Sequence, residues 1–177
     1  MIQRVLTLLV LLSLQLFARQ YDNTLLDIEA KLFPKIAMLE KNTKNISSPN
    51  LSIAIISQEI DLDIAHKLKS RILKNYPDKI LNKKIVIEIR NSKDILTKEI
   101  DAIIILHHPK EVLLSIASWA NRRNVLSFAY DAADLDYNIL ASIYIGKTTK
   151  PYLNTKIIKK YGFTFDPYLL QLSKLKK

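Results

Sequence analysis

The sequence predicts a single α/β domain of three-layer, Rossmann-like type, with a mostly parallel central sheet followed by a C-terminal β-hairpin and short helices. Three observations predict this class. Short β-branched apolar runs alternate with longer segments of helical periodicity, as in βαβ units. The 177 residues suit one hydrophobic core. Hydrophobic residues make up 49% of the chain and charged residues 25%, as in globular proteins.

Residues 1–18, MIQRVLTLLVLLSLQLFA, differ from the rest of the chain. Arg4 precedes an apolar run from Val5 to Phe17 that is short for a bilayer span, and Ala18 offers a small residue for cleavage. We therefore expect a secretory signal peptide, with an uncleaved anchor as the rival interpretation. Residues 19–177 then form the folded domain.

Residues 19–50 are expected to form an N-terminal helix and a loop. Apolar residues follow the possible cap Asn23 at helical spacing. They are Leu25, Ile28, Leu32, Ile36 and Leu39. Pro34 should kink this helix or start a second one. The stripe containing Phe33, Ile36 and Leu39 is expected to face the core, with partner binding as the alternative, and residues 41–50 are polar and predict a loop.

Residues 51–130 are expected to form the βαβ core. Four short runs rich in β-branched or aromatic residues predict strands. They are 51–57, 84–90, 101–107 and 124–130. A helix is predicted between the first two, a shorter one after Arg90 capped by Ser92, and a third from Pro109 to Arg123 with His108 as N-cap and Pro109 at the first helical position.

Residues 131–177 are expected to form the hairpin and the C-terminal helices. Residues 131–138 form an acidic loop, and two extended runs within 139–154 flank Gly146, which favours a hairpin. A short helix should then end at Gly162. Asp166 and Pro167 are typical of the N-cap and first position of a final helix.

Composition excludes several kinds of site. The chain has no cysteine, so neither a disulfide framework nor a thiolate site can form. Its two glycines do not build a phosphate-binding loop. The net charge is +10, but the basic residues form no arginine-rich or aromatic-interleaved motif, so nucleic acid is not an expected partner. The basic C-terminal helices leave peripheral contact with anionic lipid open, and no cofactor is expected.

Polar residues follow the ends of the predicted strands. In an open parallel sheet, ligands bind in the crevice beyond these carboxyl ends. The predicted ligand- or partner-binding residues are Ser57, Gln58, Asn91, His107, His108, Tyr130 and Asp131. A histidine–carboxylate metal or acid–base pair between His107 or His108 and Asp131 is a further alternative. Asp131, Asp134 and Asp136 are otherwise expected to form a solvated acidic loop.

Two parts of the chain resemble the YfiR/HmsC-like family of bacterial periplasmic proteins. They are IEAKLFPKIAMLEKN (28–42) with LSIAIIS (51–57), and ASIYIGKTTKPYLNTKIIKKYGFTFDPYLLQLSKL (141–175). The C-terminal part carries Leu153-Asn154, Gly162-Phe163 and the closing Leu169-Leu170-Gln171-Leu172. The family's glycine-rich step before the hairpin is replaced by Asn138-Ile139. The cysteines found in some members are missing.

The resemblance implies a periplasmic, non-enzymatic regulator. Such a protein would contact the periplasmic sensor part of an inner-membrane diguanylate cyclase, and so act on cyclic-di-GMP and biofilm control. A histidine kinase is the alternative signalling partner. The alternative is a small periplasmic solute-binding protein for a transporter or sensor, which would bind a small molecule. A metal-dependent hydrolase is a third interpretation, and a homodimer is left open.

Overall fold

The computed structural model describes residues 21–41, 48–94 and 100–177. The predicted signal peptide lies outside these residues, as does most of the loop predicted at 41–50. The strands are β1 (Asn50–Ile56), β2 (Lys84–Arg90), β3 (Ala102–Ile105), β4 (Leu126–Ala129), β5 (Ala141–Tyr144), β6 (Lys150–Asn154) and β7 (Lys174–Lys176). The helices are α2 (Asn23–Met38), α3 (Leu62–Asn75), α4 (Lys110–Arg122), α5 (Thr155–Tyr161) and α6 (Pro167–Leu172), with 3₁₀ turns η1 (Glu59–Asp61) and η3 (Ala132–Tyr137).

The strands form one sheet in the order β2-β1-β3-β4-β5-β6-β7. Strands β2, β1, β3, β4 and β5 run parallel, whereas β5 and β6 form an antiparallel hairpin. The predicted α/β class, with its mostly parallel sheet and C-terminal hairpin, is therefore confirmed. Because the chain winds outward in opposite directions from β1 and β3, the crevice expected of such sheets lies between the carboxyl ends of these two strands.

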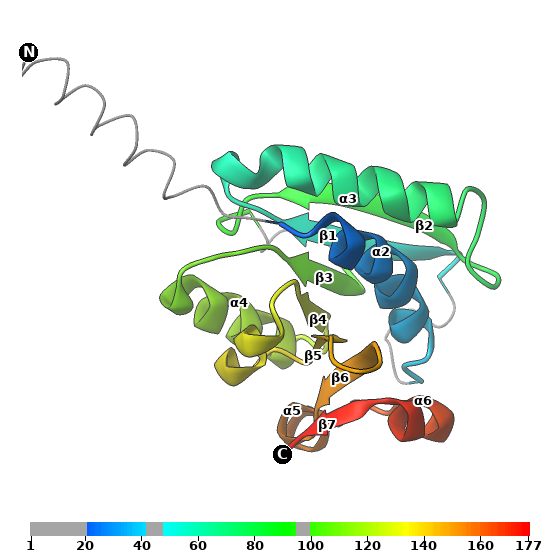
Figure 1. The fold of residues 1–177 in the computed structure, drawn as a ribbon, viewed down its shortest axis with the longest axis vertical. Helices are drawn as coiled ribbons and strands as arrows, with labels where there is room; N and C mark the ends of the chain where they lie inside the picture. The colour runs from blue at the N-terminus through cyan, green and yellow to red at the C-terminus, as the bar shows by residue number, and fades with distance from the viewer. Residues whose placement is uncertain (1–20, 42–47, 95–99) are drawn as a thin grey trace, which may run out of the picture.

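Helices cover both faces of the sheet (Figure 1). Alternate side chains of a strand point to opposite faces. Ile104 of β3 therefore packs in the core under α2 and α3, while Ile103 and Ile105 pack in the core under α4. Phe33 of α2 stacks on Phe128 of β4, with ring centroids 4.8 Å apart. This contact fixes α2 against the middle of the sheet.

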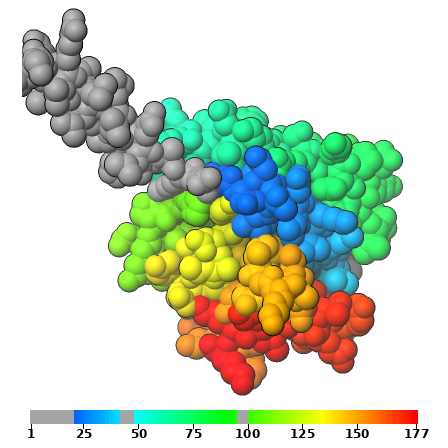
Figure 2. Space-filling model, viewed as in Figure 1, coloured from blue at the N-terminus to red at the C-terminus, as the bar shows by residue number. Residues whose placement is uncertain are grey.

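Helix α2 is continuous through Pro34 and is not divided there. Its buried residues include Leu26, Ala30 and Phe33, whereas Leu39 of the predicted stripe is 37% exposed. Packing of this face retains the helix although Pro34 lacks an N–H donor. Figure 2 shows the residues of α2 lying between the surface of α3 and that of residues 131–154.

The C-terminal segment departs from the prediction at its end. Gly162 ends α5 with a φ of 75°, and the Asp166 side chain caps α6 as expected. The final helix, however, ends at Leu172, and the next residues form β7 beside β6. The Ser173 hydroxyl donates to the Leu169 carbonyl oxygen at 2.7 Å, which closes the helix and allows an extended chain to follow.

The helix predicted after Arg90 is not found in the residues that the structure describes there. Residues 91–94 form a turn, in which the Lys93 N–H donates to the Asn91 carboxamide oxygen at 3.2 Å. Ser92 therefore lies within a turn and caps no helix in this stretch. Residues 95–99, where the rest of that prediction falls, lie outside the described residues.

Candidate functional site

The carboxyl edge of the sheet carries three packed rings, from Tyr21, His107 and Tyr130, which we call the strand-end cluster. The centroid of Tyr21 lies 4.9 Å from that of His107 and 4.7 Å from that of Tyr130. The His107 and Tyr130 centroids are 5.1 Å apart, with the rings nearly perpendicular. These distances are typical of favourable aromatic pairs. Tyr21 and His107 are half-buried, and Tyr130 is buried.

Hydrogen bonds join the N-terminal residues to this edge. The His107 N–H donates to the Tyr21 hydroxyl at 3.2 Å, and the Asp22 N–H donates to the Tyr130 hydroxyl at 2.7 Å. The Gln58 side-chain amide donates to the His107 carbonyl oxygen at 2.7 Å. Tyr21 and Asp22 therefore lie over the predicted crevice, where they contact the residues that follow β3 and β4.

The other predicted site residues have local roles. Ser57 is buried, and its N–H donates to the Arg90 carbonyl oxygen at 3.0 Å. Asn91 is exposed and closes the turn after β2. Asp131 caps η3 by accepting from the Ala133 N–H at 2.8 Å. The structure thus brings Gln58, His107 and Tyr130 together and uses Asn91 and Asp131 in turns.

His108 does not cap α4, contrary to the prediction. Pro109 occupies the N-cap position and α4 begins at Lys110, so Pro109 is not the first helical residue. The buried His108 ring directs Nδ1 to the Leu106 carbonyl oxygen at 2.9 Å. The adjacent histidines therefore separate: His107 belongs to the strand-end cluster, and His108 turns back toward the end of β3.

Glu29 of α2 was not among the predicted site residues. Its side chain is fully buried, and neither carboxyl oxygen has a hydrogen-bond partner among the described residues. Burial raises the pKa of Glu29 well above its ordinary value. Burial also raises the pKa of Tyr130, and the negative charge of Glu29 adds a smaller increase. A helical wheel centred on Phe33 would have placed Glu29 on the buried face.

The acidic residues after β4 lie on and beside η3. Burial, with a contribution from the charge of Asp131, raises the pKa of Asp134 to about 6. Asp136 contacts the Lys176 ammonium group of β7. Within residues 21–41, 48–94 and 100–177, no three histidine or carboxylate side chains are grouped so that they could hold a metal ion. That result concerns groups of three or more side chains, so the predicted pairing of a histidine with Asp131 stays a prediction.

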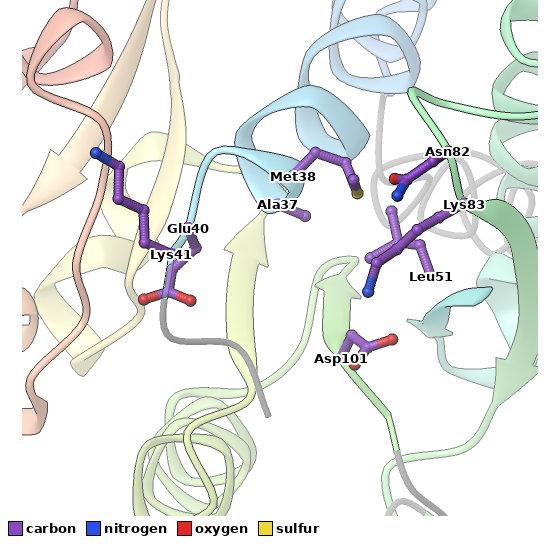
Figure 3. Close-up of a pocket in the computed structure, with 8 residues that line it drawn as sticks. All are labelled: Ala37, Met38, Glu40, Lys41, Leu51, Asn82, Lys83 and Asp101. Atoms are coloured by element: carbon purple, nitrogen blue, oxygen red, sulfur yellow. The ribbon is translucent and has the colours of Figure 1, made fainter. Parts of the chain in front are cut away.

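A cavity of about 310 Å³ lies at the opposite, amino edge of the sheet (Figure 3). Leu51 is the second residue of β1 there, while Lys83 and Asp101 directly precede β2 and β3. The full lining is Ala37, Met38, Glu40, Lys41, Leu51, Asn82, Lys83 and Asp101. Sequence reasoning did not predict this cavity. The available signal was a charged residue at or directly before the start of each of two predicted strands.

The basic C-terminal surface includes one lysine with a defined contact. The Lys174 ammonium group lies 3.4 Å from the ring centroid of Tyr144 and 5.1 Å from that of Tyr152, which favours a cation–π contact. Lys156, Lys159 and Lys160 of α5 are exposed. None of the helices in the described part of the chain is long and apolar enough to cross a membrane.

No family model and no curated protein matches the chain. Among solved structures, it is similar to a conserved domain protein from Vibrio cholerae, with 13% identity, a TM-score of 0.60 and coverage of 86% of this chain and 60% of that one. It is also similar to an ABC domain in complex with L-Trp from Streptococcus pneumoniae, with 13% identity and a TM-score of 0.55, covering 85% and 61%. The chain therefore spans about three fifths of each structure, and these likenesses show the fold.

Proposed function

We propose that the chain is a non-enzymatic regulatory binding protein that contacts a partner protein through the strand-end cluster. One observation carries this proposal: the crevice is already covered by Tyr21, so that half-buried tyrosine and imidazole rings form its surface. Tyrosine side chains that are held in place make effective anchors in protein interfaces, because little conformational entropy is lost on binding. A packed surface of this kind suits a protein partner.

The proposed partner is the periplasmic sensor part of an inner-membrane diguanylate cyclase or histidine kinase. The family resemblance and the predicted signal peptide support this choice of partner and of compartment. The protein would bind one state of the sensor more tightly than the other and so shift the population of the two states. By the same coupling, a signal that shifts the sensor to its other state would lower the sensor's affinity for this protein.

Periplasmic solute binding is the second candidate function. It is favoured by the similarity to an ABC domain that holds L-Trp, and by the cavity at the amino edge. A solute binder should show a clear rise in its melting temperature with its ligand, because a ligand that binds only the folded state stabilises it. A rise with L-Trp would favour this candidate over the regulator.

Replacing His107 by alanine should weaken binding of the isolated sensor part at least about tenfold, since an anchor residue contributes about 1.4 kcal/mol or more. Isothermal titration calorimetry measures the change directly. His107→Ala should lower the melting temperature by only a few degrees, because the half-buried ring loses its packing on Tyr21 and Tyr130 and no backbone hydrogen bond. His66→Ala is the matched control, because His66 is exposed on α3 and should bind the sensor as the unchanged protein does.

Equal affinities for His107→Ala and the unchanged protein would remove the strand-end cluster from the interface. Tyr21→Ala provides a second check from the opposite side of the cluster, with the exposed Tyr168 as its control position. A loss of binding in Tyr168→Ala but not in Tyr21→Ala would place the contact on α6 instead.

A further inference from the structure

The cavity at the amino edge contains acidic and basic side chains that are buried. Glu40, Lys83 and Asp101 are 5%, 7% and 6% exposed, so two acids and one base line a space of about 310 Å³. Such a volume is within the range of small-molecule sites. Ala37, Met38 and Leu51 supply an apolar part of the wall. The cavity therefore combines polar groups with room for a short hydrocarbon chain.

The two acidic residues differ in their surroundings. Asp101 accepts the Ser52 N–H at 2.7 Å, and in Figure 3 the Lys83 ammonium group points toward Asp101. Glu40 lies on the other side of the cavity in this view. Its Oε1 accepts the Thr164 N–H at 2.8 Å. Lys83 is therefore placed to balance Asp101 and does not face Glu40.

The second carboxyl oxygen of Glu40 is the unusual group. Oε2 is buried and has no hydrogen-bond partner within the described ranges. A buried polar atom without a partner is costly, so native proteins rarely keep one without a water, an ion or a ligand. The neighbouring Lys41 ammonium group lies 3.8 Å from Asp166 and points away from the cavity in Figure 3.

We propose that this cavity binds a small organic amine, whose ammonium group donates to Oε2 of Glu40 and whose alkyl chain lies against Met38. The excess of acidic over basic buried groups favours a cation and disfavours an anion of the same size. The site is at the opposite edge of the sheet from the strand-end cluster, so it does not depend on the proposed partner.

Titration of the purified protein with n-pentylamine tests this site, and hexanoate serves as an anion of similar length. Met38 is the only methionine apart from Met1, so its ¹³C-labelled methyl group reports on the cavity in an NMR spectrum. Pentylamine should move the Met38 signal with a saturable dependence on concentration, and hexanoate should not. A Met38→Leu sample assigns the signal.

Glu40→Gln should raise the dissociation constant for pentylamine at least about tenfold, because it removes the charge from the hydrogen bond. Glutamine retains an oxygen for the Thr164 N–H, so the variant should fold. Glu59→Gln is the matched control, because it changes the net charge equally at an exposed position. An unmoved Met38 signal in the unchanged protein, an equal response to hexanoate, or unaltered affinity in Glu40→Gln would each overturn the proposal.

Discussion

Replacing Phe33 by alanine should lower the free energy of unfolding by about 3–5 kcal/mol. Phe33 is 0% exposed and stacks on Phe128, which is 1% exposed, so truncation removes a large buried ring and leaves a cavity between α2 and the sheet. Most of this loss is transfer free energy, and the stacking geometry adds to it. Urea unfolding followed by circular dichroism measures the change.

Ile60→Ala is the control for this experiment. Ile60 is 76% exposed in η1, so its truncation should change the free energy of unfolding by no more than about 0.5 kcal/mol. If Phe33→Ala cost no more than Ile60→Ala, α2 would not be packed on the sheet as described. The position of Tyr21 over the crevice depends on that packing, because Tyr21 directly precedes the N-cap of α2.

Replacing Glu29 by methionine should raise the free energy of unfolding by about 1–3 kcal/mol even where the carboxyl group is neutral. Glu29 is fully buried and both oxygens lack partners within the described part of the chain, so its polar group is desolvated without compensation. Methionine has a similar unbranched shape and favours helices. The gain should be visible in urea unfolding at about pH 5.

The gain from Glu29→Met should increase with pH. Because burial raises the pKa of Glu29 in the folded protein, the folded state holds its proton at pH values where the unfolded state has lost it. Stability contributed by this proton is present below the unfolded pKa and is lost as the pH rises through the folded pKa. The difference between the variant and the unchanged protein should therefore be larger at about pH 8 than at about pH 5.

Glu111→Met is the control for Glu29→Met, because Glu111 is exposed in the first turn of α4. It should be neutral or slightly destabilising, since a charge that favours the helix N-terminus is removed. A destabilised Glu29→Met, or a gain that does not change with pH, would mean that the Glu29 carboxyl group is hydrated or bonded in solution.

Hydrophobic periodicity predicted most of the sheet, because the strands of a parallel sheet consist of short runs of apolar residues that can be recognised in the sequence. The run at 84–90 coincides with β2, and the other three overlap β1, β3 and β4 closely. Strand β7 could not be predicted in the same way. Lys174-Leu175-Lys176 has no local strand signal, and it becomes a strand by pairing with β6, more than 20 residues earlier in the chain.

Part of the candidate site could be predicted, namely the residues that stand at the carboxyl ends of the predicted strands. The strand-end rule brought His107 and Tyr130 to one edge. The contribution of Tyr21 was not predictable, because it depends on where α2 packs in space. Glu29 was missed because the predicted stripe followed apolar residues alone, whereas the buried face around Phe33 includes one charged residue.

Hydrogen–deuterium exchange with and without the isolated sensor part tests the partner surface most directly. If the strand-end cluster binds the sensor, the complex should protect the backbone amides of residues 106–108, 130–131 and 57–58, which converge at that edge. Residues 80–83 at the amino edge should exchange as in the free protein. Protection confined to the amino edge or to α5 and α6, with the strand-end amides unchanged, would contradict binding through this cluster.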